Sequence, residues 1–152
     1  MLLNRNFRDM LSALNAEGAE YLIIGAYALG TYLPPRATGD FDIWVRPNLE
    51  NAERVWKALI HFGAPRRDLT LQDLATVDNV FRIGMPPQRI DILTSITGVD
   101  FDDAWKNRVN ETIDGLHVTV IGRNDLLKNK RATGRPKDLV DAQDLERTLG
   151  DH

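Results

Sequence analysis

The chain has 152 residues, of which 43% are hydrophobic and 27% charged, and its formal net charge is −3 at pH 7. This length and balance fit one compact domain with a core of its own and exclude wholesale disorder. The sequence contains no cysteine and only three scattered histidines. Disulfides, thiolate-bound metals and a histidine-built zinc centre are therefore not expected.

The sequence does not resemble that of a membrane or exported protein. No apolar stretch approaches the roughly 20 residues that a bilayer span requires. The first residues, Met1 to Arg5, become polar and charged at once and lack the apolar core of a secretory signal. We therefore expect a cytoplasmic protein with no membrane partner.

The first half of the chain predicts alternating helices and short strands. The spacing of its apolar residues predicts helices over residues 5–17, 26–33 and 49–62 and strands over 21–24 and 40–45. Asn48 is a suitable N-cap for the third helix, and Gly63 lies just past its end. Pro34 and Pro35 end the second helix, because proline cannot continue one.

The second half predicts two hairpins and a helical C-terminus. Strands are expected over 80–83 and 89–93, and over 109–113 and 116–121, with helices near 100–106, 124–133 and 137–149. Asp114-Gly115 between the second pair of strands is a favoured two-residue turn. Residues 64–78 carry no readable pattern. This order of strands and helices predicts a mixed α/β or α+β sheet with helical cover.

Asp40 and Asp42 form the most informative pair in the sequence. Because successive strand residues point to opposite faces, Phe41, Ile43 and Val45 are expected in the core and both carboxylates on the other face. Two such carboxylates repel each other unless a cation lies between them. A hard divalent ion, which prefers oxygen ligands, would explain the pair. An isolated Asp-x-Asp is more often an ordinary turn and surface strand, so this interpretation depends on other residues.

Three further features favour a site. The strand at 21–24 ends at Gly25 and leads into a helix, whose first N–H groups bind phosphate well. Arg36 and Thr38 precede the acid pair, where a cation could contact an anionic substrate. Asp91 lies on another strand, opposite its apolar neighbours, and would complete a cage of three carboxylates for two metal ions. Each feature alone also has an ordinary structural explanation.

The stretch from Arg123 to Lys137 is basic, with six lysines and arginines against Asp125. A solvated helix face is the simplest interpretation of this stretch. It gains functional interest only if it faces a site that handles phosphates.

Taken together, Gly25-Ala26, Asp40-Phe41-Asp42 and Asp91 resemble the motifs of the nucleotidyltransferase superfamily with the DNA polymerase β type fold. The similarity is greatest to small bacterial members, the minimal nucleotidyltransferases and the AbiEii-like toxin components. It covers about residues 20–95 and extends to the tail motif Lys130-Arg131-x-x-Gly134-Arg135-Pro136-Lys137-Asp138-x-x-Asp141. It implies an α+β fold: a mixed β-sheet nucleotidyltransferase core over residues 1–122, with helices on one side. A short C-terminal helical pair, residues 123–152, would pack on that core.

The resemblance also implies an activity and assigns the residues that would carry it. The enzyme would use divalent metal to transfer NMP from an NTP to a hydroxyl of tRNA, protein or a small molecule, releasing pyrophosphate. Asp40, Asp42 and Asp91 would be the catalytic residues and the ligands of two Mg²⁺ ions, with Mn²⁺ as the alternative. The residues expected to bind the nucleotide phosphates are Gly25, Ala26, Arg36, Thr38, Lys130, Arg135 and Lys137. Similar proteins also suggest a toxin–antitoxin or phage-defence role with a cognate partner.

One position departs from the pattern. Many active relatives have Ser or Gly where this chain has Ala26, and the serine hydroxyl would help to hold the triphosphate. The alternatives are therefore a degenerate member that binds a nucleotide or a partner without catalysis, a partner-binding antitoxin that uses its C-terminal helices, and a metal-dependent nuclease. Convergence of the three carboxylates is the feature that would separate catalysis from simple binding.

Overall fold

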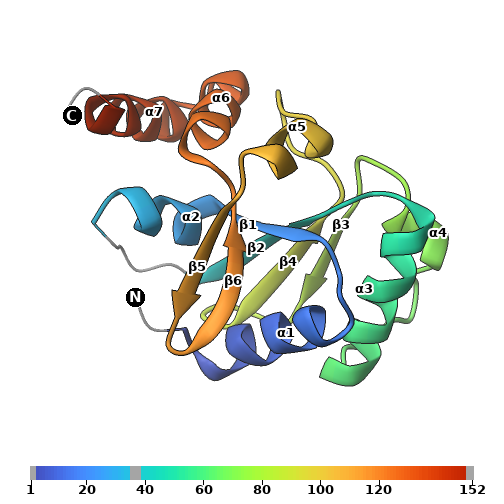
Figure 1. Ribbon diagram of the computed structural model, residues 1–152. Coiled ribbons are helices and arrows are strands. Elements are labelled where there is room, and N and C mark those ends of the chain that lie inside the picture. The colour runs from blue at the N-terminus through green and yellow to red at the C-terminus, as the bar shows by residue number, and fades with distance from the viewer. Residues whose placement is uncertain (1–2, 35–38, 150–152) are drawn as a thin grey trace.

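Six strands form one mixed sheet in the order β3-β4-β2-β1-β6-β5 in the computed structural model, which describes residues 3–34 and 39–149 (Figure 1). The strands are β1 (Tyr21–Ile24), β2 (Asp40–Val45), β3 (Val80–Ile83), β4 (Arg89–Leu93), β5 (Val109–Ile113) and β6 (Leu116–Val120). Parallel pairing joins β2 to β4 and β1 to β6, whereas β1–β2, β3–β4 and β5–β6 are antiparallel. The central strands β2 and β4 are therefore brought together from distant parts of the chain.

Seven helices are assigned within the described residues. They are α1 (Arg5–Ala16), α2 (Gly25–Tyr32), α3 (Leu49–Phe62), α4 (Leu71–Leu74), α5 (Phe101–Lys106), α6 (Arg123–Thr133) and α7 (Pro136–Leu149). The expected caps of α3 are present: the Asn48 side chain accepts a hydrogen bond from the Asn51 N–H, and Gly63 ends the helix at φ +89°. The left-handed conformation at Gly63 costs little because glycine has no Cβ.

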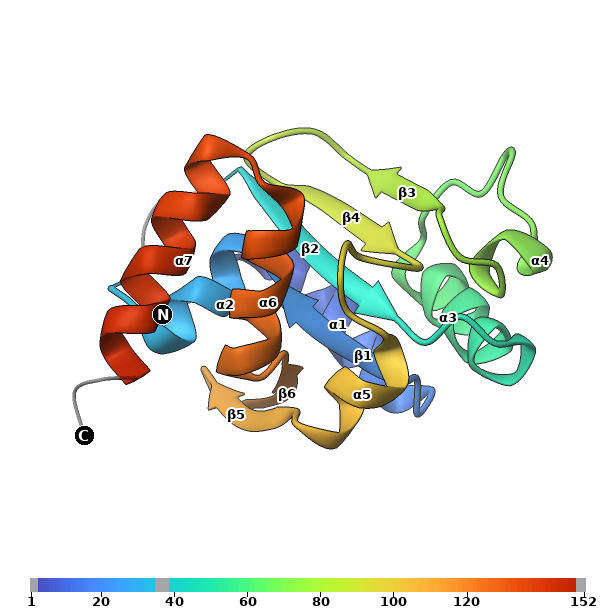
Figure 2. The same cartoon turned by 90° about the horizontal axis from the view of Figure 1, so that it is seen from above.

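The two faces of the sheet have different cover. Helices α1 and α3 lie against one face, where Phe7 of α1 stacks on Phe41 of β2 with ring centroids 4.6 Å apart (Figure 1). On the opposite face, Phe101 of α5 packs edge-on against Trp44 at 5.0 Å. Helices α6 and α7 lie on this second side, in front of the sheet as seen in Figure 2. The second side is also the one that carries Asp40 and Asp42.

Both predicted hairpins are confirmed, and their turns explain the pairing. Asp114 and Gly115 both have positive φ, +52° and +78°, as a tight turn between antiparallel strands requires. Residues 64–78 contain the one helix that the sequence did not predict, α4. Its signal is a capping box, in which the Thr70 side chain accepts from the Asp73 N–H and Asp73 accepts from the Thr70 N–H.

The C-terminal pair is held by ion pairs between its two helices. The Nζ of Lys130 lies 3.1 Å from Asp138 and 3.3 Å from Asp141, and Arg131 pairs with Glu146 at 2.9 Å. The α+β class, the mixed sheet and the C-terminal helical pair are thus confirmed. The proposed boundary after residue 122 falls at the start of α6 and stays a prediction. No helix among the described residues is long and apolar enough to cross a membrane.

Candidate active site

Parallel pairing of β2 with β4 brings the predicted acids together. Asp42 and Asp91 are Cα partners in this pairing, and Asp40 is the partner of Arg89. Strand alternation places all four side chains on the same face of the sheet. The intervening side chains Phe41, Ile43, Ile90 and Ile92 are at most 1% exposed and face the core on the other side. The predicted convergence of the carboxylates on adjacent strands is therefore present.

The crowding of negative charge affects Asp42 most. Burial, followed by the charges of Asp91 and Asp40, raises the pKa of Asp42 to about 6. Arg89 opposes this effect, and a hydrogen bond with Asp91 adds to it. The neutral form of an acid is favoured wherever a carboxylate is desolvated beside other carboxylates. Without a divalent cation, Asp42 therefore holds a proton near pH 6.

A guanidinium lies among the acids. The Nη2 of Arg89 donates to Asp40 at 3.0 Å and to Asp91 at 3.4 Å. Its Nε is 3.2 Å from Oδ1 of Asp91. A second arginine, Arg82 on β3, reaches to 3.9 Å from the same Asp91 oxygen but is largely exposed. Arg89 is thus the cation that bridges β2 and β4 across the cluster.

The contact between Arg89 and Asp91 is close but incompletely bonded. Both Nε of Arg89 and Oδ1 of Asp91 are buried, and neither has a hydrogen-bond partner within the described part of the chain. The 3.2 Å approach between these atoms is an ion pair without hydrogen-bond geometry. Buried polar atoms in this state cost free energy, because they have lost water without gaining a partner.

The donor set fits a divalent cation by its chemistry. Three carboxylates converge, one of them keeps a buried and unbonded oxygen, and hard cations prefer such oxygen ligands. The side chains are not yet arranged as a cage: no group of three His, Cys, Asp or Glu in residues 3–34 and 39–149 has metal-holding geometry. The Arg89 guanidinium lies between the carboxylates and explains this arrangement.

Gly25 forms the fourth side of the acidic cluster. A Cβ at this position would lie 2.4 Å from Oδ2 of Asp42, and the residue has φ +71°, so only glycine fits without displacement. Gly25 is also the first residue of α2, and its N-cap, Ile24, offers no side-chain hydrogen bond to the helix. The free N–H groups of the first turn, including that of Ala26, therefore begin beside the carboxylates.

The other predicted phosphate contacts have different positions. Lys130 is bound between Asp138 and Asp141, and Arg135 pairs with Asp138 at 2.8 Å. Lys137 is exposed near the start of α7. The structure therefore does not bring these three residues into contact with the acids. Arg36 and Thr38 lie outside the described residues.

Sequence reasoning missed the two arginines of the site. Arg89 lies two residues before Asp91, so strand alternation alone places both on one face. Arg82 is the Cα partner of Asp91 across the predicted hairpin. The signal was available in the pattern Arg-x-Asp. Its connection to Asp40 required the parallel pairing of β2 with β4, which no local pattern specifies.

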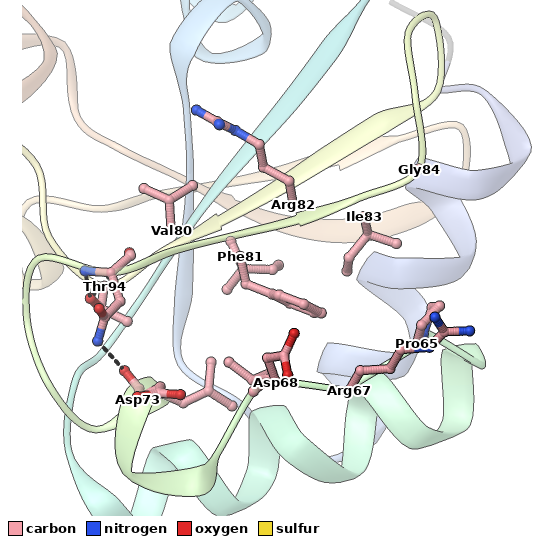
Figure 3. A pocket seen from close by; sticks show the side chains of 14 residues that line it. Pro65, Arg67, Asp68, Asp73, Val80, Phe81, Arg82, Ile83, Gly84 and Thr94 are labelled. Atoms are coloured by element: carbon pink, nitrogen blue, oxygen red, sulfur yellow. Dashed lines mark hydrogen bonds between the residues drawn. The ribbon is translucent and has the colours of Figure 1, made fainter.

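A pocket of about 480 Å³ lies on the opposite face of the sheet, between β3 and the segment 65–74 (Figure 3). Phe81 and Ile83 point into it, and Arg82 points away from it. Because Arg82 shares its face with Asp91, the pocket is separated from the acids by the sheet itself. It is not part of the acidic site.

The fold is that of a known structure described as a nucleotidyltransferase. A crystal structure of a Thermotoga maritima protein, provisionally given that description, matches all of this chain and 97% of its own, with a TM-score of 0.63. The sequences are 14% identical, so the likeness establishes the shared fold. Neither the protein-family models nor the curated proteins gave a match.

Proposed function

We propose that this protein is a metal-dependent nucleotidyltransferase that transfers NMP from an NTP to a hydroxyl acceptor. The convergence of Asp40, Asp42 and Asp91 on one face, beside the start of α2, is the observation that carries the proposal. Packing does not explain three neighbouring acids, one of them with its pKa raised to about 6. The shared fold with a protein described as a nucleotidyltransferase supports the same class.

Asp40, Asp42 and Asp91 would hold the divalent cations, Mg²⁺ or Mn²⁺. When bound, such ions neutralise phosphate charge and lower the pKa of the acceptor hydroxyl. Asp91 is suited to accept the proton of that hydroxyl, because its Oδ1 lacks a hydrogen-bond partner among the described residues. The acceptor oxygen forms a bond to the α-phosphorus, and the bond from that phosphorus to the pyrophosphate breaks.

Gly25 and Ala26 would hold the phosphates by backbone N–H groups. The first turn of α2 has free donors and the positive end of the helix dipole, both of which favour an anion. Gly25 also allows the backbone to approach Asp42, so phosphates and cations would be held side by side. The absence of a hydroxyl at Ala26 implies weaker nucleotide binding than a serine would give.

A non-catalytic nucleotide-binding or partner-binding protein is the second candidate. Two observations favour it: Ala26 lacks the serine hydroxyl, and Arg89 lies between the acids that would hold metal. The acceptor in the first proposal is a hydroxyl of tRNA, protein or a small molecule. A cognate partner in a toxin–antitoxin or phage-defence pair is compatible with either candidate.

Nucleotide binding tests the proposal without knowledge of the acceptor. ATP, CTP, GTP and UTP would each be titrated calorimetrically into the wild-type protein and the Asp40→Asn/Asp42→Asn variant, with and without Mg²⁺. Binding that requires both the metal and the acids is the expected result and identifies the donor. Metal-independent binding that survives the double substitution would favour the non-catalytic candidate, and a lack of binding would favour a partner-binding role.

A further inference from the structure

We propose that Arg89 is an internal counter-ion of the acidic site, which braces Asp40 and Asp91 in the metal-free protein and competes with the divalent cation for them. In this role Arg89 is a positioning residue, and it is released when the cation binds. The inference rests on the proposed function, because it assumes that the acids bind metal.

The geometry places Arg89 where a cation would balance the acids. Its Nη2 contacts Oδ2 of Asp40 at 3.0 Å and Oδ2 of Asp91 at 3.4 Å, so one nitrogen bridges two strands. The Asp91 side chain is only 10% exposed, and water therefore does little to screen its charge. A buried carboxylate without a partner is costly, and Arg89 supplies the partner.

Charge makes the two cations alternatives. The divalent ion and the guanidinium would both be bound by oxygens of Asp40 and Asp91, which lie on adjacent strands at paired positions. Each oxygen that donates to a metal ion is lost as an acceptor for Arg89. Because the two cations also repel each other, binding of one weakens binding of the other.

The Arg89 contact is one that can be broken. Its Nε and Oδ1 of Asp91 are buried, 3.2 Å apart and without hydrogen-bond partners in the described part of the chain, so the pair lacks the full bonding of a bidentate bridge. The side chain is 29% exposed, which leaves its head a route to water. A guanidinium released beside the site could then donate to a substrate phosphate.

Arg82 provides a matched control. It is also an arginine near Asp91, on the neighbouring strand, but it is 65% exposed and its Nε stays 3.9 Å from Oδ1 of Asp91. A charge held at that distance in solvent interacts weakly. Removing the Arg82 charge tests the effect of net charge, and removing the Arg89 charge tests the bridge.

The test measures Mn²⁺ affinity by calorimetry and thermal unfolding of the full chain, with and without Mn²⁺. We expect Arg89→Gln to lower Tm in EDTA and to bind Mn²⁺ on the order of tenfold more tightly than wild type, as loss of a competing ligand predicts. Arg82→Gln should resemble wild type in both measurements. Arg89→Lys keeps the charge without the planar fork, and should fall between wild type and Arg89→Gln.

The possible results separate this inference from the proposed function. Equal or weaker Mn²⁺ binding by folded Arg89→Gln would overturn the inference alone. An equal gain in Arg82→Gln would also overturn it, because the effect would then be one of net charge. If Arg89→Gln does not fold, the comparison of Arg89→Lys with wild type decides the question. A lack of Mn²⁺ binding in every variant, with or without NTP, would overturn the proposed function.

Discussion

Asp42 and Asp91 are Cα partners on the parallel strands β2 and β4, and a hydrogen bond joins their carboxyl groups. Such a bond requires a proton, which the raised pKa of Asp42 supplies in the absence of metal. The same two oxygens sets would be drawn to a divalent cation. The pair is therefore the point at which protonation and metal binding exclude each other.

Stability of the metal-free protein should depend on pH through Asp42. Its pKa is raised from 3.8 to about 6 in the folded protein, so the folded state keeps a proton that the unfolded chain loses in that window. The resulting stabilisation is fully present below pH 3.8 and is lost as pH rises through about 6. Asp42→Asn should remove this component and be more stable than wild type at pH 7. Denaturant midpoints in EDTA at pH 4, 5, 6 and 7 measure the difference.

The control for this experiment is Asp103→Asn on the exposed side of α5. It should follow the wild-type pH profile. A constant difference in stability between Asp42→Asn and wild type across pH 4–7 would contradict the assigned protonation.

Replacement of Gly25 by alanine should damage the site more than the fold. Gly25 and Gly18 both have left-handed backbones, φ +71° and +68°, so alanine strains either by about 1–2 kcal/mol. A Cβ on Gly25 would also meet Oδ2 of Asp42 at 2.4 Å, whereas nothing lies within 4 Å at Gly18. The Asp42 carboxyl must then move away. Gly25→Ala should lose metal-dependent nucleotide binding, and Gly18→Ala should keep it at a similar Tm. Equal nucleotide affinity in the two variants would refute the close approach.

Ala26→Ser should strengthen nucleotide binding. The position is the second residue of α2, whose N-terminus has no side-chain cap. A hydroxyl there adds a donor for a charged phosphate, and such a hydrogen bond contributes about 1.5–3 kcal/mol, on the order of tenfold or more in Kd. Calorimetric titration of the preferred NTP measures the change, with Ala28→Ser as the control because Ala28 is buried. An unchanged Kd would place the phosphates elsewhere.

Lys130 should matter for stability before it matters for substrate. Its Nζ lies between Asp138 and Asp141, and the Asp141 side chain is only 2% exposed. Removing the lysine leaves buried carboxylates without their cation, which typically costs about 3–5 kcal/mol. Lys130→Met should therefore unfold at lower denaturant, whereas Lys137→Met at an exposed position should not. Loss of NTP binding at unchanged stability would instead support the predicted phosphate contact.

Much of the fold could be predicted because its signals are local. Asn48 and Gly63 mark the two ends of α3, and Asp114-Gly115 sets the β5–β6 turn. Helix α4 was missed although Thr70 and Asp73 form its capping box, because four residues give too short a hydrophobic pattern.

The site was predictable in its residues and unpredictable in its contacts. Alternation along β2 and β4 places Asp40, Asp42 and Asp91 on faces, and this part needs no tertiary information. The contact of Arg89 with Asp40 depends on which strands become neighbours. Likewise, the basic tail residue Lys130 was expected at the phosphates from its charge, yet its partners are decided by how α6 packs on α7.

The pairing of β2 with β4 also has a kinetic consequence. Asp40 and Arg89 are 49 positions apart in sequence, and α3, α4 and β3 form between them. Closing so long a loop is entropically costly, and contacts of this kind form late when folding is slow. Local helices can therefore appear during refolding before any cation site exists. Recovery of Mn²⁺ binding would then report the completion of the sheet, and would lag behind the return of helical signal.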